Sequence, residues 1–375
     1  MLTWIHWGAL FLTLYTYLLF PALLSVLLKF CRNNDAAAPL KLTNPPSVAI
    51  LCAMYNEEKV VREKIENFRK LNYGHPRLYI GSDGSSDRTN CILEALKNDD
   101  QIRVFIFPRR GKVHVLNDLI EAASEDILIF TDANSMFEPD AVKKLVEPFV
   151  DGQIGGTCGR LVLLDESGTS GEGFYWRYET FIKKVESRFN CVIGANGAIY
   201  AIRRELVALL PSNTINDDFT ISMRALEKGF GIRYVQDAVA TEKAQPDDAV
   251  EFRRHVRDAA GHYRAVAYLK IMLNPLHFKR FFFYVSHRVI RWFVPHFLLL
   301  LLIIPLFQLH DKWIKGFYLI QLTCYGIALL GYLSGTRRKF FYIPFYFVYI
   351  NVALMIGFLR NLIGVQKVMW DSTTR

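Results

Sequence analysis

The chain has 375 residues, of which 51% are hydrophobic and 14% aromatic, and its formal net charge is +9. That length allows about two globular units. The six cysteines are scattered without a Cys-x-x-Cys pair, which argues against a disulfide framework and a zinc site and favours reduced thiols in or near the cytosol. Many basic residues flank apolar segments, as at Lys279-Arg280 and Arg337-Arg338-Lys339. We therefore expect the charge to face a membrane surface, and we expect no nucleic-acid partner.

The N-terminal segment is apolar. Residues 1–28 contain no Asp, Glu, Lys or Arg, and this run is long enough to cross a bilayer as a helix. It lacks a basic start and is too long for the apolar region of a signal peptide. We therefore predict a transmembrane helix over 1–30, followed by a polar linker over 31–46.

A pattern of alternating strands and helices begins after the linker. Short apolar, β-branched runs predict four strands, and helical patterns lie between them. The strands are expected at residues 47–53, 78–80, 104–107 and 127–130. This alternation is typical of βαβ units, and it predicts a Rossmann-like α/β fold with a mainly parallel sheet. The acidic segment Tyr55-Asn56-Glu57-Glu58 is expected to open the first of the helices.

The fourth predicted strand runs directly into Thr131-Asp132-Ala133-Asn134. In open α/β sheets, ligands bind at the carboxyl ends of the strands. Side chains two positions apart on an extended backbone point the same way, so Asp132 and Asn134 can offer oxygen atoms to one cation. Mg²⁺ and Mn²⁺ prefer such ligands and usually share them with substrate phosphates. A strand that ends in an ordinary Asp/Asn turn is the alternative.

Two more loops at the same edge carry polar residues suited to a nucleotide. Asp83 could accept a hydrogen bond from a base or ribose, and Lys112 could neutralise a phosphate as a point charge. Neither a Gly-x-Gly-x-x-Gly motif nor a Walker A motif is present. Dinucleotide binding and P-loop chemistry are therefore not expected.

In this order, the polar motifs resemble the nucleotide-sugar half of family 2 glycosyltransferases, which have the GT-A fold. The motifs are Tyr55-Asn56-Glu57, Asp83-Gly84-Ser85-Ser86-Asp87, Arg110-Gly111-Lys112 and Asp132-Ala133-Asn134. The resemblance implies that Tyr55, Glu57 and Asp83 hold the uridine side of the donor. It also implies that Lys112 lies near the diphosphate and that Asp132 reaches the metal.

The resemblance continues in the second half of residues 47–265. Segments 155–160 and 194–198 resemble those that line the acceptor side in the family, although glycine-permitted turns beside strands are an alternative. Asn216-Asp217-Asp218 takes the place of the Thr-Glu-Asp motif, which implies that Asp218 is the general base. Such a base is needed because a sugar hydroxyl is a poor nucleophile until its proton is removed. An acidic pair at a helix start is the alternative.

The sequence departs from the family pattern at three positions. Where the family has Gln-x-x-Arg-Trp, Arg257 matches and is implied to stabilise the leaving diphosphate, but Arg254 replaces Gln and Asp258 replaces Trp. The aromatic residue stacks on the acceptor sugar in processive members, so processive synthesis is not implied here. A basic amphipathic helix on the membrane surface is the alternative for this segment. Asn134 stands where a second Asp is usual, which predicts weaker cation binding.

The C-terminal part is again apolar. We predict interfacial helices over 266–291 and three spans within 292–375, at 292–309, 317–333 and 340–359. With one span before it, the catalytic domain would be cytoplasmic and the protein a multi-pass protein of the cell membrane. Four spans would put the tail outside, although its basic residues favour the inside.

These features predict a membrane-embedded, inverting hexosyltransferase. It would move a sugar from a nucleotide-sugar, with UDP expected, to a lipid-linked or glycan acceptor in cell-surface polysaccharide or glycolipid synthesis, using Mg²⁺ or Mn²⁺. One alternative is a polyprenyl-phosphate glycosyltransferase. A second is a catalytically weak scaffold that binds nucleotide-sugar within a synthase complex. The membrane location leaves room for partners in synthesis or export.

Overall fold

A computed structural model describes residues 1–30, 44–164, 174–243, 248–336 and 338–366. Most of the predicted linker 31–46, basic residue Arg337 and the tail from 367 lie outside the described residues. The chain forms two compact units. The helical unit contains the described residues of Met1–Lys29, Asp247–Pro275 and Phe281–Gln366, and the sheet unit contains those of 30–246 and 276–280. Residues 248–265, which we expected within the catalytic domain, thus belong to the helical unit.

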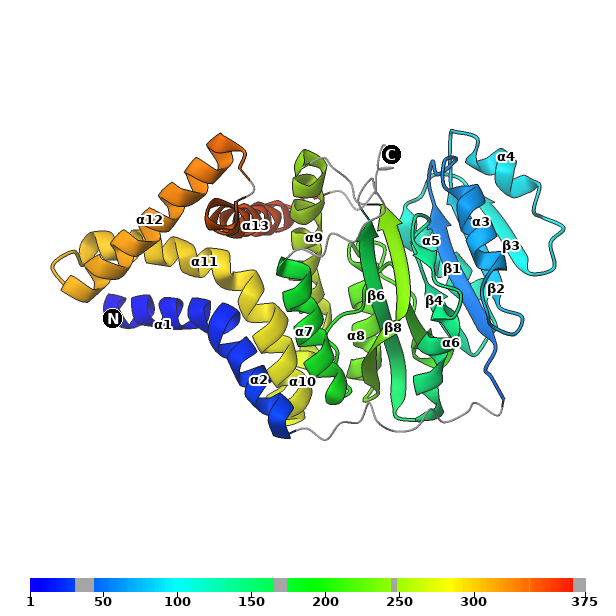
Figure 1. Ribbon diagram of the computed structural model, residues 1–375, viewed down its shortest axis with the longest axis horizontal. Coiled ribbons are helices and arrows are strands. Elements are labelled where there is room, and N and C mark those ends of the chain that lie inside the picture. Colours follow the sequence, from blue (N-terminus) through cyan, green and yellow to red (C-terminus); the bar gives the residue numbers. More distant parts are fainter. Residues whose placement is uncertain (31–43, 165–173, 244–247, 337, 367–375) are drawn as a thin grey trace. The chain divides into compact units, whose positions relative to one another are not determined.

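The first half of the sheet unit is a four-stranded parallel sheet in the order β3-β2-β1-β4 (Figure 1). Its strands are β1 (Val48–Met54), β2 (Arg77–Asp83), β3 (Ile102–Phe107) and β4 (Ile127–Phe130). All seven residues of β1 are buried, as expected for a central parallel strand with helices on both faces. The four strands predicted from the apolar runs are therefore confirmed.

Four further strands extend the sheet beyond β4 in the order β7-β6-β8-β5. They are β5 (Met136–Phe137), β6 (Ile154–Leu164), β7 (Tyr200–Arg203) and β8 (Gly231–Lys243). Here β7 is antiparallel to both β4 and β6, while β8 is parallel to β6. The sheet is therefore mixed in this half. Residues 155–160, for which turns were an alternative, lie inside β6.

Helices cover both faces of the sheet. They are α3 (Val61–Arg69), α4 (Thr89–Glu94), α5 (Lys112–Ala122), α6 (Ala141–Val146), α7 (Phe174–Arg188) and α8 (Asp217–Glu227), with short 3₁₀ turns η3 (Glu147–Val150) and η4 (Arg204–Leu206). Helix α3 places Val61, Ile65 and Phe68 in one hydrophobic core with alternate residues of β1. Helix α5 packs on β1 and β2, and an added Cβ on Gly81 would lie 2.3 Å from Cγ1 of Val115. A side chain at position 81 would thus require Val115 to move.

The helix expected to open at Tyr55 begins instead at Val61. Asn56 has a positive φ of 53°, which does not continue into a right-handed helix. Its backbone N–H donates to Oγ of Ser85 at 3.0 Å, so the segment after β1 is held as a loop by the loop after β2. The prediction of a helix from Tyr55 was wrong because these contacts between distant residues outweigh the local preference of the acidic residues.

Among the described residues, four helices are long and apolar enough to cross a membrane. These are Leu2–Lys29, Pro275–Phe307, Lys312–Ser334 and Lys339–Leu362. The first is built from α1 (Leu2–Leu14), η1 (Tyr15–Leu19) and α2 (Phe20–Phe30), and the second from η6 (Pro275–His277), α10 (Phe278–Tyr284), η7 (Val285–Val289), α11 (Ile290–Ile303) and η8 (Ile304–Phe307). The remaining elements are α9 (Asp248–Tyr268), η5 (Lys270–Leu273), α12 (Lys312–Ser334) and α13 (Lys339–Leu362). Residues 275–291, expected to be interfacial, run on into the second long helix.

The topology brings several loops of the sheet unit to one edge. Strands β1 to β4 are parallel neighbours, so the segments that follow them emerge at the same edge of the sheet. Strand β7 is antiparallel to β4, and Tyr200 at its start pairs with Phe130 at the end of β4. The segment 194–198 before β7 therefore reaches the same edge. This edge is where the candidate site is assembled.

Candidate active site

The loops after β1 and β2 are interlocked by reciprocal hydrogen bonds. Oδ1 of Asn56 accepts from the backbone N–H of Ser86 at 2.8 Å. The backbone N–H of Glu57 donates to Oγ1 of Thr89 at 2.9 Å, and that of Glu58 donates to Oδ2 of Asp87 at 3.1 Å. The carboxylate of Glu57 is largely buried, with 9% of the residue exposed. These contacts fix the backbone on which Tyr55 and Glu57 are carried.

Asp83 is fully buried at the end of β2 and organises the loop after β3. Its carboxylate accepts the backbone N–H groups of Arg110 at 2.7 Å and Gly111 at 3.0 Å, and it forms an ion pair with Arg109. Gly111 has a φ of 100°, which an L side chain rarely adopts, and it brings its N–H to this carboxylate. The structure thus shows Asp83 holding residues 109–111. Its contact with uridine stays a prediction.

Arg109 was not singled out from the sequence, although it precedes the Arg-Gly-Lys motif. Its guanidinium lies 3.5 Å from the centre of the Tyr55 ring and pairs with Asp83. Tyr55, Arg109 and Asp83 therefore form one stacked cluster from the ends of β1, β2 and β3. The stacking of the planar, charged guanidinium on the aromatic ring stabilises the conformation of both side chains in this part of the site.

Lys112, at the start of α5, pairs with two carboxylates. Its Nζ lies 3.0 Å from Oδ1 of Asp132 and 3.3 Å from Oδ2 of Asp217. Burial lowers the pKa of Lys112, but the nearby charges of Asp132, Asp217 and Asp218 outweigh this effect and raise the pKa above its usual value. Lys112 is therefore held in its charged form. Asp217 was not predicted as a site residue, and its position beside Asp218 was the available signal.

Asp132 and Asp218 face the same space over Gly197. A Cβ built on Gly197 would lie 3.3 Å from Oδ2 of Asp218 and 3.7 Å from Oδ2 of Asp132, so the two oxygens cannot be further apart than the sum of these distances. Asp218 lies in the first turn of α8, and its Oδ1 accepts the N–H of Phe219 at 2.7 Å. The structure thus brings the predicted base and the predicted metal ligand together.

The chemistry of Asp132 and Asn134 fits a hard divalent cation. The Oδ2 atom of Asp132 faces the space over Gly197, and Asn134 is half-buried. Among the described residues, no group of three or more His, Cys, Asp or Glu side chains could hold a metal by itself. The residues therefore fit a cation with few protein ligands, the arrangement that Mg²⁺ adopts when substrate phosphates complete its coordination. The coordination by Asp132 and Asn134 remains a prediction.

Arg257 belongs to the other unit. It lies half-buried on α9, and its Nη2 is 3.4 Å from Oδ1 of Asp258. Within the helical unit, α9 packs on α13, and a Cβ on Gly357 would lie 2.5 Å from Cβ of Ala259. The expected contact of Arg257 with the leaving diphosphate stays a prediction.

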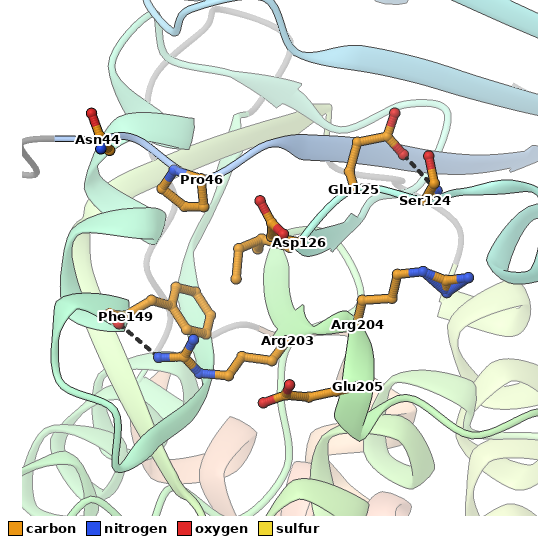
Figure 2. A pocket seen from close by; sticks show the side chains of 10 residues that line it. Asn44, Pro46, Ser124, Glu125, Asp126, Phe149, Arg203, Arg204 and Glu205 are labelled. Carbon is orange, nitrogen blue, oxygen red and sulfur yellow. Dashed lines mark hydrogen bonds between the residues drawn. The ribbon is translucent and has the colours of Figure 1, made fainter.

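The cavity in Figure 2 is separate from these loops. It has a volume of about 600 Å³ and lies at the amino end of β4, beside Asp126 and Ile127, whereas Asp132 follows the carboxyl end of that strand. Arg203 points across it toward Phe149, whose carbonyl accepts a hydrogen bond from its guanidinium at 2.6 Å. Oδ2 of Asp126 accepts from Oγ of Ser47 at 2.7 Å. Two of the polar side chains that line this cavity, Arg203 and Asp126, are thus engaged within the fold.

Residues 49–207 match the model of the family described as Glycosyl transferase family 2. The chain carries a family 2 glycosyltransferase domain. The matched residues include every loop that follows β1 to β4 and the segment before β7. They end before Asp218, so the geometry over Gly197 is the observation that links Asp218 to the family 2 domain.

Curated relatives of this chain include two poly-β-1,6-N-acetyl-D-glucosamine synthases. The protein from Staphylococcus aureus strain COL is 25% identical over 246 residues, which are 64% of this chain and 59% of the relative. The protein from Staphylococcus epidermidis is 28% identical over 213 residues, which are 56% of this chain and 46% of the relative. The chain therefore spans about three fifths or less of the length of the curated relatives that it matches.

Among solved structures, this chain is similar to a mannosyltransferase from Pyrobaculum calidifontis in complex with GDP-Man and Mn²⁺. The TM-score is 0.68 at 18% identity, and the match covers 96% of this chain and 99% of the other. This likeness establishes the GT-A glycosyltransferase fold, with apolar helices at both ends of the chain. The fold class predicted from the sequence is confirmed.

Proposed function

We propose that this protein is a membrane-embedded, inverting glycosyltransferase that moves a sugar from a nucleotide-sugar to a lipid-linked or glycan acceptor. The observation that carries the proposal is the convergence of Lys112, Asp132 and Asp218 on the space over Gly197. Similarity to poly-β-1,6-N-acetyl-D-glucosamine synthases supports a role in polysaccharide synthesis. Four apolar helices among the described residues support a multi-pass membrane protein. We place the catalytic domain on the cytoplasmic side, and we take the donor to be UDP-linked, as part of the same proposal.

In this mechanism the sheet edge holds the donor. Tyr55, Glu57 and Asp83 are proposed to bind the nucleoside, and Lys112 to contact the diphosphate. A divalent cation bound at Asp132 and Asn134 would neutralise charge on the diphosphate as it leaves. Lys112 would remain protonated beside Asp132, since neighbouring carboxylates raise its pKa. The sugar of the donor would then lie over Gly197, between Asp132 and Asp218.

Asp218 is proposed to take the proton of the acceptor hydroxyl. The half-buried carboxylate lies across the space over Gly197 from Asp132, and removing the proton during attack makes the hydroxyl a better nucleophile. The hydroxyl would attack the anomeric carbon on the face opposite the diphosphate. By analogy with single displacement in inverting glycosidases, the configuration of the sugar inverts.

A second candidate is a transferase that adds one sugar to a polyprenyl phosphate. It is favoured by Asp258, which stands where processive members have an aromatic residue for the acceptor sugar. Product analysis separates the two candidates. A single glycosyl-phospholipid would support the second candidate, whereas a glycosidic bond to an existing sugar would support the first.

The proposal is tested with the full chain in nanodiscs. UDP- and GDP-sugars are screened with Mn²⁺ and with excess chelator, and released nucleotide and glycosylated product are measured together. We expect Mn²⁺-dependent transfer from one nucleotide-sugar to a lipid extract or an oligosaccharide. If none of the nucleotide-sugars binds or turns over, the proposed function is wrong.

A further inference from the structure

Lys64 on α3 is a buried lysine in contact with the loop that carries Asp132 and Asn134. Only 3% of Lys64 is exposed. Its Nζ donates to Oγ1 of Thr131 at 2.9 Å and to the carbonyl of Ser135 at 2.5 Å. One ammonium group thus connects the two ends of the segment 131–135.

The end of this segment and the residues just after it are also held by side chains from distant elements. Asn67, three residues after Lys64 on α3, donates to the carbonyl of Phe137 and accepts its N–H, both at 2.8 Å. The Nζ of Lys64 lies 4.8 Å from the centre of the Phe137 ring. Ser135 donates to Glu242 on β8. Side chains of helix α3 therefore hold the backbone between β4 and β5 in place through hydrogen bonds.

Burying the ammonium group of Lys64 at this position costs free energy of desolvation. Burial disfavours the charged form and lowers the pKa of Lys64, although nearby Cys52, Asp132 and Glu242 act in the opposite direction. A methionine of similar length would avoid this desolvation cost, but it would leave the Thr131 hydroxyl and the Ser135 carbonyl without the ammonium donor. What the lysine adds over an apolar side chain is therefore a pair of hydrogen bonds that fix both ends of segment 131–135.

We propose that Lys64 is a positioning residue that sets the conformation of segment 131–135 and so places Asp132 and Asn134 for the cation and donor. The proposal rests on the proposed function, because it deepens the account of that same site. Lys64 itself does not touch the donor in this scheme. It acts through Thr131 and the carbonyl of Ser135, as groups behind metal ligands commonly do.

The test is Lys64→Met in the full chain in nanodiscs, with two readouts. The first readout is the thermal unfolding midpoint. The second is Mn²⁺ binding in the presence of UDP or GDP, followed by the loss of the electron paramagnetic resonance signal of free Mn²⁺. We expect a lower midpoint, because two buried acceptors lose their donor, and a Mn²⁺ affinity that is about 10- to 100-fold weaker in the folded protein, the usual effect of removing support behind metal ligands. A loss of stability alone would lower the midpoint and leave the Mn²⁺ affinity of the folded protein unchanged.

Ile65→Val is the matched control, because Ile65 is the next residue on α3 and packs in the core. It should lower the midpoint slightly and leave Mn²⁺ binding unchanged. If Lys64→Met does not fold, Thr131→Val removes the hydroxyl acceptor at nearly constant volume and should weaken Mn²⁺ binding by a smaller factor. Normal Mn²⁺ affinity in either folded variant would overturn the proposal. Failure of the wild type to bind Mn²⁺ with either nucleotide would instead refute the proposed function, and this inference would fall with it.

Discussion

The Oδ2 atoms of Asp132 and Asp218 lie on either side of the space over Gly197, within 3.7 Å and 3.3 Å of the position that a Cβ would take. Asp132 follows β4 and Asp218 lies on α8, so the two carboxylates are far apart in the sequence. The antiparallel pairing of β7 with β4 brings Gly197, which precedes β7, to the end of β4. Glycine at position 197 keeps the space between them open.

Alanine at this position should therefore impair the reaction without disturbing the fold. The backbone of Gly197 lies outside the left-handed region, so alanine is compatible with it. The added methyl group would enter the space proposed for the donor sugar. We expect Gly197→Ala to lower kcat/KM by about 100-fold, because small displacements of reacting groups have effects of that order.

Gly152→Ala is the control for this substitution, since a Cβ at Gly152 would have no heavy atom within 4 Å. It should leave kcat/KM and the unfolding midpoint unchanged. Wild-type turnover in Gly197→Ala would show that the space between Asp132 and Asp218 is not where the reaction takes place.

Asp87 predicts a pH dependence of stability in the interlocked loops. Burial raises its pKa, but hydrogen bonds from Thr89 and the N–H of Glu58 outweigh this and lower the pKa below its usual value. A group with a lowered pKa stabilises the fold above its unfolded pKa of about 3.9 and loses this effect as the pH falls through the folded pKa. The difference in unfolding midpoint between wild type and Asp87→Asn should be constant above about pH 5 and shrink toward pH 3. A difference that grows on acidification would contradict this explanation.

Asn134 predicts how the cation requirement can be changed. The amide oxygen can coordinate a cation but brings no charge, whereas a carboxylate would add one. Asn134→Asp should therefore reduce the Mn²⁺ concentration needed for half-maximal nucleotide-sugar turnover. Loss of activity with unchanged Mn²⁺ affinity would show that Asn134 does not face the cation.

The central sheet could be predicted from the sequence because its signal is local. Strand β1 is buried along its whole length, so it appears in the sequence as an unbroken apolar run. The segment after it could not be predicted in the same way. Its helix starts six residues later than expected, at Val61 rather than Tyr55. Contacts with Ser85 and Thr89 decide that conformation, and these residues lie about 30 positions away in the chain.

The site could be predicted in part for a similar reason. Asp132 and Asp218 follow from motifs that the chain retains, and the structure brings them together. Lys64 could not be found in this way, because on the sequence it is one charge among several on a polar helix. Only the tertiary structure shows that it is buried beneath the loop that carries Asp132.

The role predicted for Arg257 stays a prediction. Its spacing within 251–261 resembles the family pattern, and the structure places α9 in the helical unit, packed on α13. A motif consists of certain residue types at certain positions. The same positions of the basic residues would also suit an amphipathic helix on a membrane surface.

The central claim is that Asp218 removes the acceptor proton from a hydroxyl that attacks a donor held at Asp132. Asp218→Asn keeps the size of the side chain but cannot act as a base. The most direct measurement compares wild type and Asp218→Asn in nanodiscs for two quantities, the Mn²⁺-dependent affinity for the nucleotide-sugar and the rate of sugar transfer. We expect an affinity within about threefold of wild type and a transfer rate reduced by about 100-fold or more. Transfer at the wild-type rate by Asp218→Asn would contradict the account.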